Sequence, residues 1–253
     1  MKDKILVTGA TSGIGKEIAY TLKKAGYDVI IHGRRDEKIE EVLQKGRFSK
    51  RIKCDLSNLE EVQDIFSEFI RLEQPDILIN NAGIGYPEDF LNGISVAKLQ
   101  KIFNINTLSP ILISNIFLKV CNHPRLILNI SSTAGEVPKP FCPIYSSSKA
   151  AINQFTKSIS QLYFKTNCRV NAISPGSINT EMTVRASMKY SQRKNISIQE
   201  AQHELYCNHV SEKHMGTVAD IANVVEFICS DKANFINGQI IQVNGGYQFE
   251  ETH

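Results

Sequence analysis

Short runs rich in branched apolar residues recur along the chain, and the segments between them have apolar residues at helical spacing. The runs lie at residues 5–7, 29–31, 51–53, 77–79, 126–128, 170–173 and 239–243. Most are continuously apolar rather than alternating, which is typical of parallel strands covered on both faces. In the first intervening segment, Ile14, Ile18 and Leu22 are four residues apart and would line one helix face.

Alternation of strands and helices along the whole chain predicts an α/β fold, a Rossmann-type doubly wound parallel sheet with helices on both faces. No linker, low-complexity tract or repeat interrupts the pattern, so residues 1–253 are expected to form a single domain. Ser57, Ser197 and Thr217 each precede an acidic residue by three positions, which predicts a capped helix start. Residues 181–215 contain few strand-like runs and are expected to form a helical insertion.

Composition and charge exclude several classes of protein. Lys and Arg number 29 against 26 Asp and Glu, and the net charge of +3 gives no reason to expect a nucleic-acid partner. The longest apolar stretch, residues 111–120, is too short and too polar to cross a bilayer, so no membrane partner is expected. The six cysteines form no C-x-x-C pair and no secretion signal precedes the first strand, which predicts reduced thiols and a cytoplasmic protein.

A glycine-rich loop, TGATSGIG at residues 8–15, follows the first strand and opens the first helix. Glycine lets the backbone turn tightly and approach a pyrophosphate, and the helix N-terminus adds free N–H groups. A nucleoside-triphosphate P-loop is excluded, because Ala10 stands where glycine is needed and Glu17 where Ser or Thr would hold magnesium. The order of strand, loop and helix predicts a dinucleotide site, with a plain tight turn as the alternative.

The end of the second strand indicates which dinucleotide is bound. A carboxylate there would bind the adenosine ribose and favour NAD, but the chain reads His32-Gly33-Arg34-Arg35. Arg34 and Arg35 suit a 2′-phosphate through charge-assisted hydrogen bonds, which predicts NADP(H). Two solvated surface arginines are the alternative. Asp55, after the third strand, either accepts a bond from the adenine amino group or is a simple turn residue.

Tyr145 and Lys149 are four residues apart and would share one face of a helix. A nearby cation favours phenolate over phenol, which predicts a lowered pKa for Tyr145 and a role as general acid or base for a carbonyl/alcohol pair. Ser132 stands just past an apolar strand, at the sheet edge where open α/β sheets place their sites.

In this order and spacing, the motifs resemble those of the short-chain dehydrogenase/reductase superfamily, in its single-domain branch. Overall pattern and length are similar to the 3-oxoacyl-carrier-protein reductase group. The matching positions are residues 8–15, Asp55, residues 80–83, Asn106, Ser131, Ser132, residues 145–149, Pro175, Gly176, Thr180, residues 238–239 and residues 244–246.

The resemblance implies a role for each catalytic position. Tyr145 would protonate the substrate oxygen and Ser132 would hold and polarise it. Lys149 would bind the nicotinamide ribose and lower the Tyr145 pKa, while Asn106 would kink its helix and hold a water that relays protons. No metal is needed, because the hydride chemistry belongs to the nicotinamide. The expected cofactor-binding residues are Gly9, Thr11, Ser12, Gly13, Ile14, Gly15, Arg34, Arg35, Asp55, Leu56, Asn81, Ala82, Gly83, Tyr145, Lys149, Pro175, Gly176, Ile178 and Thr180.

Cofactor and substrate stay open at this point. Ser12 stands where NADP-preferring members of the superfamily often carry a basic residue, which keeps NAD(H) as an alternative. The substrate is a 3-oxoacyl thioester, or else 3-hydroxybutyrate, a sugar or a polyol. A non-catalytic dinucleotide-binding sensor is the alternative of another class, and it would lack Tyr145 or Lys149. Candidate contacts for an acidic acyl carrier protein are Lys119, Arg125, Lys165 and Arg169.

The resemblance implies that residues 181–215 form a lid over an apolar substrate, with ordinary core packing of two short helices as the alternative. Within this segment His203, Cys207, His209 and His214 match no zinc spacing, so no metal is expected. The resemblance also implies a homotetramer or homodimer in which helices at about 107–120 and 145–164 pair; packing of these helices on their own sheet is the alternative. The candidate contacts are Ile111, Leu112, Ile116, Leu118, Ile152, Phe155, Ile159 and Leu162.

Overall fold

The computed structural model describes residues 3–85, 90, 93–139, 141–162, 167–208, 210–211 and 213–246. Seven strands of this described part form one sheet in the order β3-β2-β1-β4-β5-β6-β7, and every pairing is parallel. The predicted α/β fold is confirmed, and each predicted apolar run lies in a strand. The strands are β1 (Lys4–Val7), β2 (Asp28–Gly33), β3 (Lys50–Lys53), β4 (Ile77–Asn80), β5 (Leu126–Ile130), β6 (Arg169–Pro175) and β7 (Ile240–Val243).

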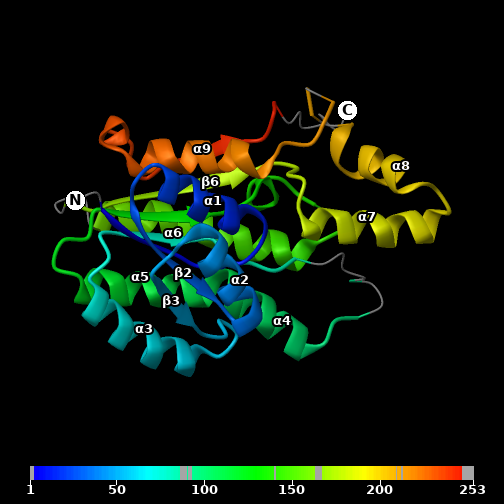
Figure 1. Cartoon of the computed structure of the whole chain (residues 1–253). Coiled ribbons are helices and arrows are strands. Elements are labelled where there is room, and N and C mark those ends of the chain that lie inside the picture. Colours follow the sequence, from blue (N-terminus) through cyan, green and yellow to red (C-terminus); the bar gives the residue numbers. More distant parts are fainter. Residues whose placement is uncertain are drawn as a thin grey trace.

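Helices cover both faces of the sheet (Figure 1). On one face α1 (Gly13–Lys24), α2 (Asp36–Gly46) and α9 (Val218–Cys229) pack over Ile5 and Val7. On the other face α3 (Leu59–Glu73) and α5 (Ser109–Val120) pack over Leu6, and α6 (Pro143–Leu162) joins them through Ile159. Because successive side chains of a strand point to opposite faces, the continuous apolar runs supply both cores.

The structure confirms two of the three predicted helix caps. Ser197 caps α8 (Ile198–Gln202) and Thr217 caps α9, each with reciprocal bonds to the acidic residue three positions later. The prediction for Ser57 is wrong, because α3 begins after Asn58, whose side chain accepts from the Glu61 N–H at 3.2 Å. The Ser57 hydroxyl donates instead to Asp55, and asparagine is an equally good capping residue.

The segment after β6 is helical, as predicted. It contains α7 (Glu181–Lys194), α8 and the π-helix η3 (His203–Cys207), and α7 and α8 lie side by side beyond the end of the sheet (Figure 1). Its two ends are tied together, because the Asn179 N–H donates to the Gly216 carbonyl and the Gly216 N–H donates to that of Ser177, both at 2.9 Å.

Four further helical segments complete the described chain: α4 (Val96–Phe103), the π-helix η1 (Asn104–Leu108), and the short 3-10 helices η2 (Thr133–Gly135) and η4 (Asp231–Ala233). Among the described helices, none combines the length and the apolar character needed to cross a membrane.

Candidate active site

The predicted site residues gather at the carboxyl edge of the sheet. The glycine-rich loop follows β1, Arg34 follows β2, Asp55 follows β3, and Ser132 follows β5. Pro175 ends β6 at the same edge. In a parallel sheet these strand ends lie side by side, so residues far apart in the sequence share one surface.

Ser132 and Tyr145 meet at this edge. A hydrogen bond joins the Ser132 side chain to that of Tyr145, and Ser132 also accepts from the Ala134 N–H at 3.2 Å. Tyr145 and Lys149 stand one turn apart on α6, with the Lys149 Nζ atom 5.9 Å from the centre of the Tyr145 ring. The two hydroxyls are therefore placed to act on one substrate oxygen.

The predicted lowering of the Tyr145 pKa is wrong for the protein without cofactor. Burial raises the pKa of this phenol to about 12, and the hydrogen bond with Ser132 only partly opposes that rise. Lys149 does not counter it, because its ammonium group is directed to the Ile130 carbonyl oxygen at 2.8 Å rather than to the phenol. Tyr145 is therefore protonated at neutral pH and suited to donate a proton.

Lys149 is a buried ammonium group, with 4% of the residue exposed. Burial lowers its pKa from 10.5 to about 8, so it is still mostly charged at neutral pH. A Cβ atom placed on Gly83 would lie 3.5 Å from both the Lys149 Nζ and the Asn106 Oδ1, so the Gly83 backbone lies beside these two groups. The glycine keeps open the space in front of the ammonium group.

Asn106 lies in η1, a π-helical turn between α4 and α5, and is 1% exposed. Its Oδ1 accepts from the Ile84 N–H and its Nδ2 donates to the Ile84 carbonyl, both at 2.8 Å. Nδ2 also donates to the Ser148 hydroxyl at 3.1 Å. The neighbouring Asn104 donates instead to the Ser57 carbonyl at 2.8 Å, so the two asparagines of this turn hold different segments. π-Helical turns occur frequently at functional sites.

The two asparagines at the end of β4 hold different parts of the structure. Asn80 is buried and donates to Ser114 and to Asn129 at 3.0 and 2.9 Å, inside the fold. Asn81 donates to the carbonyls of Thr8 and Gly9 at 2.9 and 3.2 Å and so braces the glycine-rich loop. Asn81, rather than Asn80, therefore touches the predicted cofactor site.

Gly9, Gly13 and Gly15 serve different needs in that loop. Gly9 and Gly13 have positive φ angles, of 65° and 52°. A side chain on Gly9 would collide with Ala82, and one on Gly15 with Asn81, so both are packing positions. A Cβ atom on Gly13 would instead lie 3.8 Å from Thr180, so these two predicted residues face each other across the site.

The first turn of α1 lacks the side-chain cap that α3, α8 and α9 have. Its N-cap residue, Ser12, is exposed and makes no capping hydrogen bond. Uncapped N–H groups at a helix N-terminus favour an anion, both by hydrogen bonding and through the helix dipole. The loop, Ser12 and the following Gly13 and Ile14 therefore fit a pyrophosphate.

Arg34 and Arg35 are exposed, and within the described chain neither forms an ion pair with a carboxylate. Neighbouring cations are paired, since Lys53 binds Asp36 and Arg51 binds Glu40. Two guanidinium groups without a carboxylate partner, after the second strand, are suited to a phosphate group.

Asp55 lies between Arg34 and the turn before α3. Burial would raise its pKa, but hydrogen bonds from the N–H and hydroxyl of Ser57, both 2.9 Å, and the nearby Arg34 charge hold the pKa below its ordinary value. The two bonds from Ser57 confirm that Asp55 is a turn residue, and its contact with adenine stays a prediction. The adjacent Leu56 is buried, and its carbonyl accepts from Ser109 at 2.6 Å.

On the opposite side of the site, residues after β6 approach the loop. Gly176 packs against Asn244, which leaves no room for a side chain. Ile178 is buried and pairs with Gly216. Thr180 caps α7 with reciprocal bonds to Thr183. These contacts place residues 175–180 along the site between the sheet and the predicted lid.

The segment predicted as a lid buries Ala201 and Cys207, but α7 exposes two methionines. Ser187 is the buried residue of α7, while Met182 and Met188 are 42% and 45% exposed. A Cβ atom on Gly85 would lie 3.4 Å from the Met182 sulfur and 3.1 Å from the Tyr145 ring, so both side chains lie beside Gly85. No group of metal-ligating side chains is found among the described residues; His209 lies outside them.

Of the four expected acyl-carrier contacts, the three described ones lie toward the amino edge of the sheet, away from the site. Arg125 precedes β5, where it binds Asp3 and Asp231, and Arg169 begins β6, where it donates to the Ile228 carbonyl. Lys119 lies in the last turn of α5, and helices that join parallel strands run back toward the amino edge. These residues are close in sequence to strands that carry the site, but they lie at the opposite ends of those strands. Lys165 lies outside the described residues.

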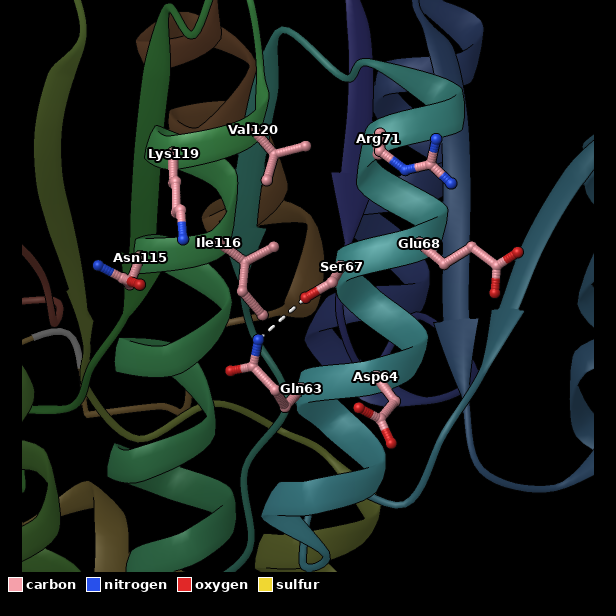
Figure 2. Close-up of a pocket in the computed structure, with 9 residues that line it drawn as sticks. All are labelled: Gln63, Asp64, Ser67, Glu68, Arg71, Asn115, Ile116, Lys119 and Val120. Atoms are coloured by element: carbon pink, nitrogen blue, oxygen red, sulfur yellow. Dashed lines mark hydrogen bonds between the residues drawn. The ribbon is translucent and has the colours of Figure 1, made fainter.

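A groove on the outer surface between α3 and α5 contains Lys119 and no predicted catalytic or cofactor residue (Figure 2). Figure 2 shows Gln63 donating to Ser67 along α3, with Ile116 facing them from α5. Ile116 and Ile152, two of the predicted subunit contacts, are 3% and 2% exposed. The prediction that they contact another subunit is wrong, because the fold of the single chain already buries both side chains.

One site residue was missed by the sequence analysis. His32, at the end of β2, is 3% exposed and contacts both the glycine-rich loop and the end of β3. Its signal in the sequence was a polar ring in an otherwise apolar strand, two residues before Arg34.

Known proteins are similar to this chain over nearly its whole length. A family model described as enoyl-(acyl carrier protein) reductase matches residues 9–248. The 3-oxoacyl-[acyl-carrier-protein] reductase FabG of Aquifex aeolicus is 34% identical over 249 residues, which are 95% of either chain. The chain belongs to the short-chain dehydrogenase/reductase family. This short-chain dehydrogenase/reductase is thus an oxidoreductase that acts on CH–OH and C=O groups with a nicotinamide cofactor.

Other relatives of this short-chain dehydrogenase/reductase differ in substrate. The 7alpha-hydroxysteroid dehydrogenase of Escherichia coli K12 is 31% identical over 248 residues, 95% of this chain and 92% of the relative. The solved L-sorbose reductase of Gluconobacter frateurii, in complex with NADPH and L-sorbose, superposes with a TM-score of 0.89 at 24% identity, over 97% of this chain and 96% of that one. At that identity the likeness shows the fold.

Proposed function

We propose that this protein is an NADPH-dependent reductase that converts a ketone into a secondary alcohol. The observation that carries the choice of cofactor is the exposed pair Arg34 and Arg35, which lack a carboxylate partner in the described chain. A carboxylate at this place would favour NAD, whereas Gly33 stands there and leaves the guanidinium groups free to bind a 2′-phosphate.

The residues of the site fit the remainder of NADPH. Bound NADPH would supply the hydride. The uncapped first turn of α1 would hold the pyrophosphate, and Thr180, which faces Gly13, would lie on the nicotinamide side. Lys149 donates one N–H to Ile130, and its further N–H groups would bind ribose hydroxyls in front of Gly83.

Ser132 and Tyr145 would act together on the substrate carbonyl. Ser132 would donate a hydrogen bond that polarises the carbonyl oxygen, and Tyr145 would transfer its proton as negative charge develops there. With a pKa of about 12, Tyr145 is protonated at neutral pH, which is the form that must donate the proton when a ketone is reduced.

For the substrate, a 3-oxoacyl thioester is the leading class. It is supported by the similarity to FabG and by the half-exposed methionines of α7, which suit an apolar acyl chain. The wrong placement of Arg125 and Arg169 removes the support for an acyl carrier protein as partner. An NAD-dependent dehydrogenase of 3-hydroxybutyrate, a sugar or a polyol is the second candidate, favoured by Ser12 at a position where a basic residue would favour NADP.

The test is a screen of NADPH and NADH oxidation with purified protein. Substrates are an acetoacetyl thioester, acetoacetate, a diketone, a steroid ketone and a ketosugar, with a crotonyl thioester to detect enoyl reduction. We expect a ketone to be reduced with NADPH in preference to NADH. Oxidation with the crotonyl thioester alone would contradict ketone reduction, and a preference for NADH would contradict the cofactor assignment.

We also propose a homotetramer or homodimer built on α5 and α6, in the cytoplasm. Leu108 and Leu162 are 41% and 72% exposed near this face, and Ile111 and Phe155 are half-buried. All six cysteines are free thiols, which fits a reducing compartment. A light-scattering mass of two or four chains is expected; a monomer at micromolar concentration would contradict the assembly.

A further inference from the structure

His32 holds the base of the glycine-rich loop with both its backbone and its ring. The ring Nδ1 atom accepts from the Gly9 N–H at 3.1 Å, and the His32 carbonyl oxygen accepts from the Ala10 N–H at 2.9 Å. The ring is buried and lies 5.6 Å from the ring of Phe66 on α3, measured between their centres. One residue of β2 therefore binds two consecutive N–H groups of the loop that follows β1.

The second ring nitrogen of His32 reaches β3. Its Nε2 atom lies 3.1 Å from the carbonyl oxygen of Cys54. A backbone N–H can only donate and a backbone carbonyl can only accept, so both ring contacts require a neutral imidazole with its proton on Nε2. Burial favours this form, because it lowers the pKa of His32 from 6.5 to about 4. The ring thus links the carboxyl ends of β1 and β3 across β2.

We propose that His32 is a positioning residue for NADPH, whose neutral imidazole sets the spacing between the glycine-rich loop and the phosphate-binding Arg34. The three strand ends that it joins carry Gly9, Arg34 and Asp55, which would face the pyrophosphate, the 2′-phosphate and the adenosine. His32 is buried beneath them and acts through the backbone. This inference rests on the proposed NADP(H) binding.

Two variants of His32 separate positioning from general packing. His32→Phe keeps a ring against Phe66 but leaves the Gly9 N–H and the Cys54 carbonyl without the ring partner. We expect its Kd for NADPH, measured by fluorescence titration, to rise roughly 5- to 100-fold. The kcat at saturating NADPH should stay within about twofold of wild type, because the groups at the carbonyl are untouched. His32→Gln carries one acceptor and one donor and should recover most of the affinity.

An unchanged Kd in His32→Phe, or a loss of kcat as large as the loss of affinity, would overturn the proposal. Wild-type protein that binds neither NADPH nor NADH would reject the proposed function and this role with it. Wild-type binding together with an unaffected His32→Phe would reject the role of His32 alone.

A second measurement needs no variant and stands if His32→Phe fails to fold. Nitrogen-15 chemical shifts of the imidazole in the wild-type protein at pH 7 report which nitrogen carries the proton. We expect the neutral Nε2–H form. A proton on Nδ1, or a charged imidazolium, is incompatible with the Gly9 contact and would overturn the proposal.

Discussion

The side-chain amide of Asn106 exchanges two hydrogen bonds with the backbone of Ile84, one in each direction and both 2.8 Å long. Ile84 follows Gly83, which lies beside the Lys149 ammonium group. The π-helical turn that carries Asn106 is therefore fastened to the loop that shapes the space in front of Lys149.

Replacing Asn106 by leucine would leave the Ile84 N–H and carbonyl groups without this partner inside the protein. We expect Asn106→Leu to lower the free energy of unfolding by about 2–4 kcal/mol and to lower kcat at least tenfold. Asn104→Leu is the matched control on the same turn, because Asn104 bonds to Ser57 away from Lys149. Urea unfolding and steady-state kinetics should show a stability loss in both variants and a large kcat loss in Asn106→Leu. Equal kcat losses would contradict this role.

Lys149→Met should stabilise the cofactor-free protein while abolishing turnover. The drop of the Lys149 pKa from 10.5 to about 8 means that burying the charged form costs about 3 kcal/mol. The methionine variant avoids this cost but also loses the hydrogen bond to the Ile130 carbonyl, so its net gain in stability is smaller than that. Between pH 8 and 10.5 Lys149 is protonated in the unfolded wild-type chain but not in the folded protein. Its contribution to the free energy of unfolding therefore increases as the pH rises over this range. The advantage of Lys149→Met, measured by thermal or urea unfolding, should shrink over that range. A variant less stable than wild type at pH 7 would contradict the prediction.

Arg34→Ala should lower the kcat/KM for NADPH much more than the kcat/KM for NADH. Loss of a charge-assisted contact to the 2′-phosphate is expected to lower kcat/KM for NADPH by about 10- to 100-fold, and Arg34→Asp should also improve NADH. Arg51→Ala removes an equally exposed arginine that is paired with Glu40, and it should leave the cofactor ratio unchanged. An unaltered NADPH-to-NADH ratio in the Arg34 variants would refute the assignment of the 2′-phosphate site.

His32 should make the fold sensitive to acid. Its pKa falls from 6.5 to about 4 on folding, so between these pH values the imidazole is protonated in the unfolded chain and neutral in the folded protein. Stability from this group is complete above pH 6.5 and is lost as the pH falls, by about 2–3 kcal/mol near pH 4.5. Asp55 is the acidic group that opposes the shift. Urea unfolding at pH 7 and pH 4.5 should show a smaller loss for His32→Gln than for wild type; equal losses would contradict the prediction.

The strands and most of the site were predictable because each depends on residues close together in the sequence. Continuous apolar runs identify strands covered on both faces, and the glycine loop and the Tyr145–Lys149 pair are local patterns. Errors arose where tertiary packing decides. The helical spacing correctly placed Lys149 beside Tyr145, but the fold turned the ammonium group toward Ile130 and buried the phenol, which reversed the direction of its pKa shift.

Other features depend on contacts between distant segments. The contact between His32 and Gly9 joins the ends of two neighbouring strands, so the sequence around His32 shows a polar ring but not the partner of that ring. Arg125 precedes β5 and Arg169 begins β6, so both lie at the amino edge, far from the site that the same strands support. Ile116 and Leu162 look alike as apolar residues on predicted helix faces, yet one is buried in the core and the other is exposed.

The central claim is that Tyr145 donates the proton in a nicotinamide-dependent ketone reduction. Its most direct test compares wild type with Tyr145→Phe, which removes one hydroxyl, using the ketone that the screen identifies. We expect the variant to bind NADPH with unchanged Kd and to lose at least about 100-fold in kcat. A Tyr145→Phe variant that retains wild-type turnover would contradict the account.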